Sequence, residues 1–289
     1  MRVLLSSLRD APTEADTDEL RLRLIDVVER LDGPRTAALA LSGGLGSSSL
    51  LFAMLATGRR PRCYTWSIEG RRSLDLESAR HLTTHFGLEL VELEIPIALP
   101  NVLADCRDLV NRFDEVNGIT IQMGHPWLYL GPAMQAHGDN AIMTGLGVDE
   151  RYLSRREIWL KIAREGEQVI LDEELRGWKR QDLDTPIGAI TDMAAKRWGI
   201  EILDGYGPKQ IDDWFMQFKL AGLHKPFDRA PSVLAFADYY GQGKFRRAKN
   251  GGQLQIKKLH DLLLTDPEIN LHGASKPRAV YTLIRNGDI

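Results

Sequence analysis

The sequence predicts an α/β fold, in which a doubly wound parallel sheet is followed by a helical C-terminal lobe. Short apolar runs alternate with helical segments at intervals of about 25 residues, and the first run leads into a glycine-rich turn. Parallel strands need helical crossovers, so this alternation favours a sheet with helices on both faces. Beyond residue 151 the alternation stops and charged, helix-forming residues dominate. We therefore expect an α/β core over residues 1–150 and a helical lobe over residues 151–289.

The predicted elements follow this order along the chain. Residues 17–31 place apolar residues at helical spacing, with Thr17 or Asp18 as the N-cap. Residues 36–42, TAALALS, form the continuous small apolar run expected of a central parallel strand. The glycine-rich turn comes next, and a helix is expected from about residue 47 to residue 56.

The pattern then repeats twice. A strand over residues 62–68 precedes a helix that Ser73 or Asp75 caps and Gly87 closes. Residues 88–96 alternate apolar and acidic side chains, which is typical of a strand near a sheet edge. The remaining expected elements are helices at 99–112 and 126–136 and a strand at 140–145 that ends in a second glycine turn.

Composition excludes several classes of function. The net charge of -3 provides no basic field that would gather nucleic acid. The sequence has no apolar run of about 18 residues, so we expect no membrane span. The apolar run near the N-terminus is too short for a secretory signal.

Two cysteines, Cys63 and Cys106, cannot form a disulfide framework, or a structural zinc site without help from His and Asp. We expect a cytoplasmic protein with two reduced thiols.

The turn SGGLGSSSL follows the first strand and has the chemistry of an anion cradle. It lacks the lysine of a P-loop and the spacing of the GxGxxG dinucleotide fingerprint. Gly43 and Gly44 allow the backbone to approach an anion closely, and Ser47 and Ser48 add hydroxyl donors. The N-terminus of the next helix points its free N–H groups at the same place. The residues predict a pyrophosphate site built from neutral donors, with a simple tight turn as the alternative.

Three segments converge on this site. In open α/β sheets, ligands bind at the carboxyl ends of the strands. Residues 42–48, Ile68 and residues 145–150 all fall at such ends. We therefore expect them to form one site.

The segment LSGGLGSSSL resembles the PP-loop of N-type ATP pyrophosphatases, and specifically the synthetase domain of the asparagine synthetase family. That family also includes β-lactam synthetases and lasso-peptide cyclases. The resemblance continues in order over roughly residues 15–260. It rests on the following further segments: residues 64–95 with Asp75, Glu77 and Ala79; MTGLGVDERYL with Gly145, Gly147, Asp149 and Glu150; residues 194–207; HKPFDR with Lys225 and Arg229; and RRAKNG. In residues 194–207 the family's Arg and Phe-Leu-Asp are lost.

The resemblance implies both a reaction and a set of residue roles. Family members attack the α-phosphate of ATP with a carboxylate, release pyrophosphate, and let an amine displace AMP to form an amide. Asp149 would bind Mg²⁺, Lys225 would neutralise charge on the phosphates unless it is a plain surface lysine, and Arg229 would belong to the catalytic group. The implied pyrophosphate cradle comprises Leu41, Ser42, Gly43, Gly44, Ser47 and Ser48. Ile68 and Gly145 would contact the adenosine.

The sequence departs from the family at two acidic positions. The family's loop is SGGxDSS, whose Asp is a magnesium ligand, and this chain has Gly46 there. The family's SGEG glutamate is replaced by Leu146, which makes that wall apolar. Asp149 and the ATP phosphates could still hold one Mg²⁺. If the loop keeps the family's geometry, Gly46→Asp should strengthen Mg²⁺-ATP binding.

Two functions follow from these residues. The first is an ATP-dependent, AMP-forming ligase that joins a small-molecule or peptide carboxylate to an amine. No N-terminal glutaminase segment precedes the synthetase region, so nitrogen would come from ammonia, a substrate amine or a separate partner protein. The alternative is a catalytically degenerate relative that binds nucleotide or a partner without turnover. Sulfur or nitrogen transfer to a nucleobase ranks last, because the usual cysteine pair is missing.

Other polar residues leave two interpretations each. His125 could contact substrate, or cap or pack against the next helix. Asp114 and Glu115 could replace the missing acids or be loop charges. A basic stretch could bind phosphate or an acidic partner, or form a solvated face; it comprises Arg246, Arg247, Lys249, Lys257 and Lys258.

Overall fold

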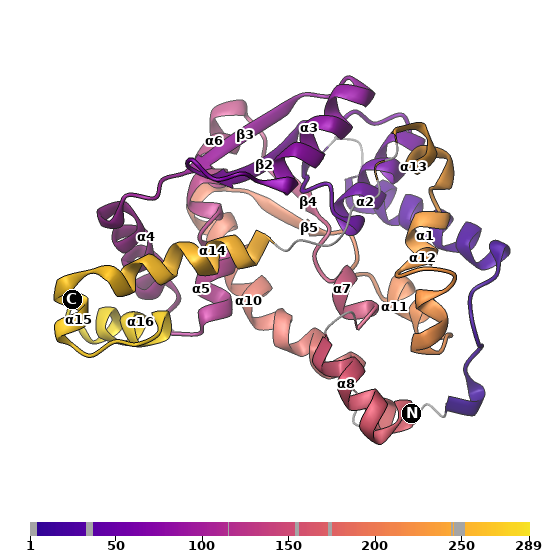
Figure 1. The fold of residues 1–289 in the computed structure, drawn as a ribbon. Coiled ribbons are helices and arrows are strands. Elements are labelled where there is room, and N and C mark those ends of the chain that lie inside the picture. Colours follow the sequence, from indigo (N-terminus) through magenta and orange to yellow (C-terminus); the bar gives the residue numbers. More distant parts are fainter. Residues whose placement is uncertain are drawn as a thin grey trace.

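A five-stranded, entirely parallel sheet forms the centre of the molecule (Figure 1). The computed structural model describes residues 5–32, 37–114, 116–153, 156–172, 175–243, 245 and 252–289. The strand order is β3-β2-β1-β4-β5, so β1 is central and β3 is an edge strand, as predicted. The strands are β1 Ala38–Ala40, β2 Cys63–Ile68, β3 Leu90–Ile95, β4 Ala141–Thr144 and β5 Glu201–Asp204. The predicted doubly wound α/β fold is confirmed.

The expectation that no strand follows residue 151 is wrong. Residues 201–204 pair with β4 in register, from Ala141 opposite Glu201 to Thr144 opposite Asp204. This strand has only four residues and two of them are acidic, so the apolar run that marks a buried strand is missing. It belongs to the segment 194–207 on which part of the family resemblance rests. The division between 1–150 and 151–289 remains a prediction.

Two hydrophobic clusters lie on opposite faces of the sheet because side chains alternate along each strand. In β1 and the residue after it, Leu39 and Leu41 join the first cluster, whereas Ala38 joins the second. The first cluster packs beneath α1 Glu14–Asp32, α2 Leu45–Ala56, α3 Leu74–Phe86, α7 Val148–Arg151, α8 Arg156–Glu165, α9 Glu167–Asp172, α11 Lys209–Phe215, η2 Leu220–His224, α12 Ala230–Leu234 and α13 Ala237–Gly243. The short η1, Leu5–Ser7, precedes them.

The second cluster is covered by a separate set of helices, which gather at the opposite end of Figure 1 from α1, α2 and α12. These are α4 Leu99–Phe113, α5 Gly118–Gly124, α6 Trp127–His137, α10 Leu175–Trp198, α14 Gly252–His260, η3 Asp261–Thr265, α15 Pro267–Leu271 and α16 Pro277–Asn286. α10 is the crossover that delivers β5 to the sheet.

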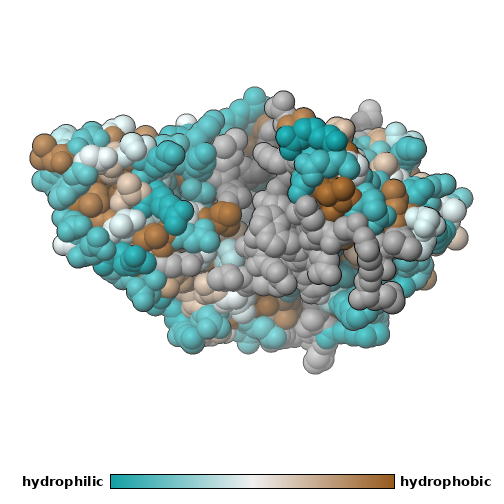
Figure 2. Space-filling view, turned by 90° about the horizontal axis from the view of Figure 1, so that it is seen from below, coloured by the Kyte–Doolittle hydropathy of each residue, from teal (hydrophilic) through white to brown (hydrophobic). Residues whose placement is uncertain are grey.

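The outer surface gives no sign of a membrane span. Within the described residues, no helix is both long and apolar enough to cross a bilayer. In Figure 2, apolar side chains are interspersed among hydrophilic ones wherever the face is coloured.

The two ends of α3 agree with the sequence prediction, whereas the start of α1 does not. α3 is capped by Ser73, whose Oγ accepts from the Leu76 amide at 3.2 Å, and Gly87 closes it in the left-handed conformation, as predicted. α1 begins at Glu14, before the predicted Thr17 or Asp18 cap. The cause is a reciprocal capping pair: the Thr13 amide donates to Asp16 at 2.7 Å, and the Asp16 amide donates to Thr13 Oγ1 at 3.4 Å.

Asp16 makes the start of α1 sensitive to acid. Burial alone would raise its pKa, but hydrogen bonds from Arg9 and Thr13 lower the pKa to about 2. A lowered folded-state pKa stabilises the fold above about pH 4, and that contribution is lost as the pH falls toward about 2. We expect Asp16→Asn to lower the free energy of unfolding at pH 7 by up to about 2 kcal/mol and to flatten its pH dependence below pH 5.

Urea unfolding at a series of pH values measures this effect. The exposed Asp18 in the same helical turn provides the matched control, since Asp18→Asn should leave the profile unchanged. Equal profiles for the Asp16 and Asp18 variants would contradict the assignment.

Candidate nucleotide-binding site

The glycine-rich turn leaves β1 at the carboxyl edge of the sheet and enters α2 directly. Leu41 is buried, and its amide donates to the Tyr64 carbonyl of β2 at 2.8 Å, which fixes the start of the turn. Gly43 has a φ of 65°, and a Cβ there would lie 2.3 Å from Ser78 Cβ of α3. Only glycine fits both the left-handed conformation and this close approach.

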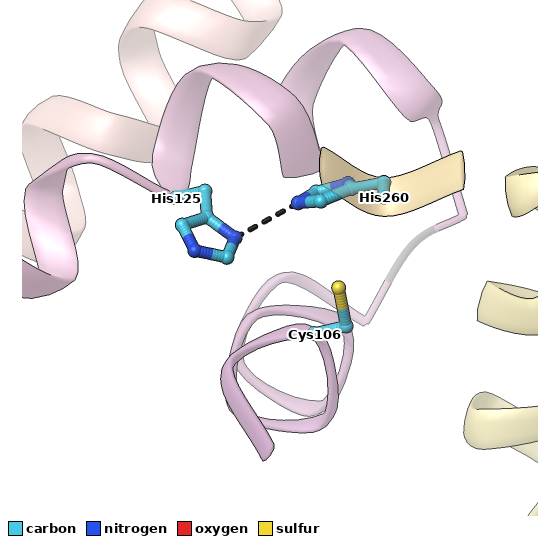
Figure 3. A group of neighbouring side chains, drawn as sticks. All are labelled: Cys106, His125 and His260. Atoms are coloured by element: carbon cyan, nitrogen blue, oxygen red, sulfur yellow. Dashed lines mark hydrogen bonds between the residues drawn. The ribbon is translucent and has the colours of Figure 1, made fainter. Parts of the chain in front are cut away.

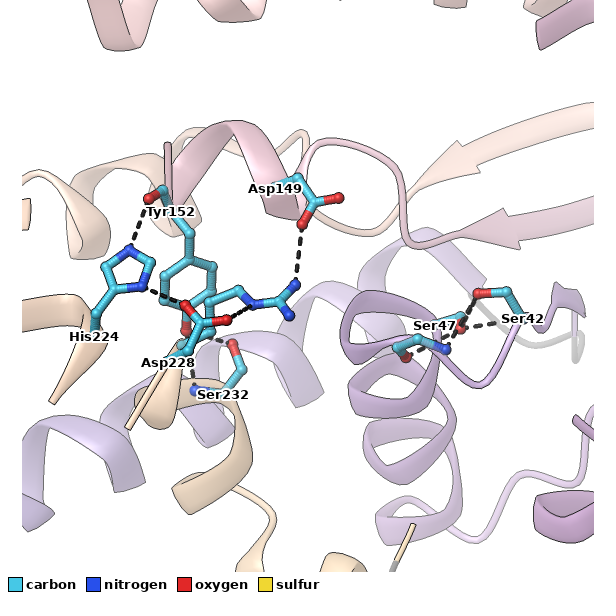
Figure 4. A network of polar contacts seen from close by, with 9 residues as sticks. Ser42, Ser47, Asp149, Tyr152, His224, Asp228 and Ser232 are labelled. Atoms are coloured by element: carbon cyan, nitrogen blue, oxygen red, sulfur yellow. Dashed lines mark hydrogen bonds and ion pairs between the residues drawn. The ribbon is translucent and has the colours of Figure 1, made fainter. Parts of the chain in front are cut away.

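Two serine hydroxyls and one amide close a small hydrogen-bonded ring at the start of α2 (Figure 4). Ser42 Oγ and Ser47 Oγ lie 3.2 Å apart, and the Gly44 amide donates to Ser42 Oγ at 3.2 Å. Ser47 Oγ also donates to the Gly44 carbonyl at 3.3 Å. These bonds are at the long end of the normal range. An anion with better-placed oxygens could replace them at little cost.

Ser48 lies in the same helical turn, and its hydroxyl, like that of the neighbouring Ser49, is buried without a hydrogen-bond partner among the described residues. An unsatisfied buried hydroxyl costs roughly 1–3 kcal/mol, so such groups are rare without a functional reason. Thr144, the last residue of β4, is buried with an equally unpartnered hydroxyl. Sequence reasoning missed Thr144, although a polar residue ending a buried strand is a usable signal.

Gly46 and Gly145 bring the loop and the turn after β4 into direct contact. A Cβ on Gly46 would lie 2.5 Å from the Gly145 carbonyl oxygen and 2.8 Å from Val148 Cγ1. A Cβ on Gly145 would lie 2.5 Å from the Ser47 amide nitrogen. Neither position accepts a side chain unless the backbone shifts. The space next to residue 46 is filled by backbone, so an Asp there requires the two turns to move apart, and the effect of Gly46→Asp on Mg²⁺-ATP binding remains a prediction.

Asp149 and Arg229 form an ion pair beside this contact. Asp149 lies in the first turn of α7, which packs against α2, and Arg229 Nη1 donates to its Oδ1 at 3.2 Å. Arg229 is mostly buried, and its Nε also donates to Asp228 Oδ2 at 3.0 Å. The guanidinium therefore joins two carboxylates. The predicted metal ligand and the predicted arginine are brought together.

A histidine and a tyrosine extend this network away from the loop (Figure 4). His224 Nδ1 lies 2.5 Å from Asp228 Oδ1, and its Nε2 donates to the Tyr152 carbonyl at 2.9 Å. Burial acts to raise the pKa of Asp228, but the hydrogen bond with His224 and the charge of Arg229 hold it below its usual value. The Tyr152 hydroxyl is buried 2.7 Å from Ser232 Oγ. The backbone of α7 is thus fixed to the segment that carries Arg229.

Sequence reasoning missed His224 and Asp228 although both lie within the segment HKPFDR. Only the spacing of Lys225 and Arg229 was used there. The spacing of four residues between a histidine and a carboxylate in the same segment was a signal for this pair.

Two predicted residues lie apart from these contacts. Ile68 is fully buried, and its side chain joins the second hydrophobic cluster, so a contact with adenosine would have to come from its main chain. Lys225 is exposed. The hydrogen bond from Lys219, with a smaller effect of the Lys225 charge, lowers the pKa of Asp10. The phosphate role of Lys225 remains a prediction.

The polar residues that the sequence left with two interpretations lie in different environments. His125 is fully buried and hydrogen-bonded to His260, as the packing interpretation predicts. Asp114 is exposed and caps α4, whereas Glu115 lies outside the described residues. Lys257 and Lys258 are exposed on α14. The rest of the basic stretch, Arg246, Arg247 and Lys249, also lies outside the described residues.

A family model matches the chain over most of the α/β core. The sequence model of a family described as asparagine synthase matches residues 19–186, which is more than half of the chain. The matched range runs from α1 through both glycine turns into α10. The curated proteins searched include none that matches the chain.

The contact between the two glycine turns can be tested by adding one methyl group. We expect Gly46→Ala to lower the free energy of unfolding by roughly 1–3 kcal/mol, because the Gly145 carbonyl and Val148 must shift. Chemical unfolding measures the change. Gly188→Ala on α10 is the control, since that position opens into free space and alanine favours a helix. A Gly46→Ala protein as stable as the parent would show that the turns are not in contact.

Proposed function

Because the chain belongs to the asparagine synthase family of ATP-using synthetases, we propose that it is an ATP-dependent, AMP-forming ligase. In this reaction a substrate carboxylate becomes an acyl-adenylate, and an amine then forms the amide. The observation that supports the proposal most strongly is the cradle at the start of α2, with its long serine hydrogen bonds and the unpartnered Ser48 hydroxyl.

The cradle suits a leaving diphosphate. The carboxylate oxygen attacks the α-phosphorus, and the bond from that phosphorus to the bridging oxygen breaks, which releases pyrophosphate. The amides that open α2, together with the hydroxyls of Ser47 and Ser48, would donate to its oxygens where negative charge develops. The amine then attacks the acyl carbon, loses a proton and displaces AMP.

Asp149 is the carboxylate that we propose for a metal ion. Asp149 is about one-third exposed, so its oxygens can reach a ligand, whereas residue 46 has neither a carboxylate nor room for one. Mg²⁺ often binds through one or two carboxylates plus phosphate oxygens. These residues fit one ion held by Asp149 and the nucleotide, and its chemistry would be to neutralise charge on the phosphates. Arg229 shares Asp149 and would supply a second positive charge there.

Leu146 limits the protonation state in which the amine substrate can react. Leu146, half-buried in the turn after β4, has no proton-accepting group where the family has glutamate. The amine would therefore arrive unprotonated or meet a base from its own substrate. Free ammonia, a substrate amine, or ammonia from a separate amidotransferase or biosynthetic partner would each meet this need.

A second function is supported by the contact between the glycine turns. Gly46 and Gly145 pack together where the family's loop carboxylate would lie, and Leu146 removes the other acid. A relative that binds nucleotide or a partner protein without turnover would need only the neutral cradle. The two functions differ in their dependence on Mg²⁺, since turnover requires the ion and binding alone does not.

The release of pyrophosphate tests the ligase. We expect ATP, Mg²⁺ and a carboxylate library to give pyrophosphate and AMP in equal amounts with at least one substrate, alone or with a partner protein. Asp149→Asn should lower the rate roughly tenfold or more, because the one metal carboxylate is lost. Asp213→Asn, which removes an exposed carboxylate on α11, is the control. No pyrophosphate with any candidate, together with ATP binding that is absent or independent of Mg²⁺, would contradict the ligase and favour the non-catalytic function.

Ser48 provides a separate test of where the nucleotide binds. Removing its unpartnered hydroxyl should leave stability unchanged or raise it by up to about 1 kcal/mol, while ATP affinity falls roughly 3–10-fold. Calorimetry and thermal unfolding of Ser48→Ala measure the two effects. Ser49→Ala is the matched control, because Ser49 is equally buried in the next position of α2 but is not among the predicted phosphate donors. Equal ATP affinity in the Ser48 variant and the parent would place the phosphates elsewhere.

A further inference from the structure

Three metal-binding side chains meet inside the second hydrophobic cluster, in the helical layer on the other face of the sheet from α2 (Figure 3). They are Cys106 of α4, His125 at the end of α5, and His260 at the end of α14. All three are fully buried, and one donor atom from each lies within 4.8 Å of the others. The nucleotide-site residues described above belong to other elements, and nothing about this cluster rests on the proposed function.

The two imidazoles face each other with their inner nitrogens. His125 Nδ1 and His260 Nε2 lie 2.8 Å apart, with the Cys106 side chain beside them (Figure 3). Each outer nitrogen lies near an oxygen, and the one on His260 makes a hydrogen bond, whereas His125 Nε2 has an ion-pair distance without hydrogen-bond geometry. His125 Nε2 lies 3.3 Å from an Asp105 carboxylate oxygen, and His260 Nδ1 lies 2.5 Å from the Tyr281 hydroxyl.

In known metal sites, contacts of this kind between the outer ring nitrogen and an oxygen orient the histidine. A ligating histidine almost always donates its other N–H to a carboxylate, a carbonyl or another oxygen, which fixes the ring and its tautomer. Asp105 is itself held by the Tyr129 hydroxyl at 2.6 Å. The inner nitrogen of each ring and the Cys106 sulfur lie within 4.8 Å of one another.

We propose that Cys106, His125 and His260 bind a divalent transition-metal ion of the zinc type, and that Asp105 and Tyr281 orient the two histidines. One thiolate and two imidazoles are donors that Zn²⁺ prefers. Binding would release one proton, from the Cys106 thiol. The proton shared between the rings would move to His260 Nδ1, where the Tyr281 oxygen accepts it.

The cluster needs only small movements to close around an ion. In a tetrahedral zinc site, two nitrogens lie about 3.3 Å apart and a sulfur and a nitrogen about 3.6 Å apart, given bond lengths near 2.0 and 2.3 Å. The rings would therefore separate by roughly 0.5 Å, and the sulfur would approach by at most about 1 Å. Rotation of side chains supplies shifts of this size.

The ion would connect distant parts of the chain. Cys106 and His125 come from the helices between β3 and β4, whereas His260 belongs to the C-terminal helices, as does Tyr281 of α16. The site would fix residues 252–289 onto the sheet. A structural role of this kind predicts that the ion raises thermal stability.

Cobalt provides the test, because Co²⁺ replaces Zn²⁺ and absorbs light. The probe is Co²⁺ added to the reduced, chelator-treated full chain. We expect one equivalent to give visible bands and a near-ultraviolet sulfur-to-cobalt band, which Zn²⁺ then abolishes, and we expect Zn²⁺ to raise the unfolding temperature. Cys106→Ser should lose the sulfur band, and Tyr281→Phe should weaken Zn²⁺ binding roughly 10–100-fold.

The second cysteine is a matched control. Cys63 is also free and fully buried, but it lies on β2 in the first hydrophobic cluster, so Cys63→Ser should keep the cobalt spectrum. If Cys106→Ser does not fold, Tyr281→Phe still gives the affinity measurement. A folded parent with no cobalt bands and no response to Zn²⁺ would overturn the proposal. So would a sulfur band that survives in Cys106→Ser, or Zn²⁺ affinity unchanged in Tyr281→Phe.

Discussion

The close backbone contact between Gly46 and Gly145 is the constraint on which the rest of the site depends. Through it, the first turn of α2 touches the turn that follows β4, so the serine ring and the acid of α7 belong to one packed unit. Protein interiors are close-packed, and a side chain at either glycine would separate the two turns. The absence of the family's loop carboxylate is therefore coupled to the backbone of this chain. Gly46 in place of a carboxylate therefore affects how the two turns pack as well as the charge beside them.

The same change alters the electrostatics of the site. A triphosphate is repelled by carboxylates unless cations lie between them, so a site with two metal-binding acids depends strongly on its metal. The acid predicted to bind the metal in this chain, Asp149, is paired with Arg229. Asp228 accepts a hydrogen bond from Arg229 Nε and is itself bonded to His224. These contacts fix the direction of the guanidinium. The described contacts of the Arg229 guanidinium are thus with two carboxylates, Asp149 and Asp228.

Local patterns in the sequence were sufficient to predict most of the fold and only part of the site. Short apolar or alternating segments predicted four strands, and Ser73 and Gly87 predicted both ends of α3, because each of these patterns acts within a few residues. The strand at 201–204 is short, half acidic and on an edge, so its position depends on pairing with β4 rather than on its own sequence. The contact of Gly46 with Gly145 joins residues a hundred positions apart, and no local pattern encodes it. The meeting of Asp149 with Arg229 was implied by family resemblance alone.

The sheet separates two kinds of interior, and the difference explains how the chain could change its chemistry and keep its fold. On the α2 face, buried hydroxyls such as Ser48 are left without partners, which costs stability and suits a ligand. On the α4 face, close polar contacts run from Asp105 through His125 and His260 to Tyr281 and connect the C-terminal helices to the core, although His125 Nε2 and Thr120 Oγ1 make no hydrogen bond to a described residue. Connections between buried polar groups favour one arrangement of helices. With that side fixed, substitutions at the glycine turns can alter the site while the strands and crossovers remain in place.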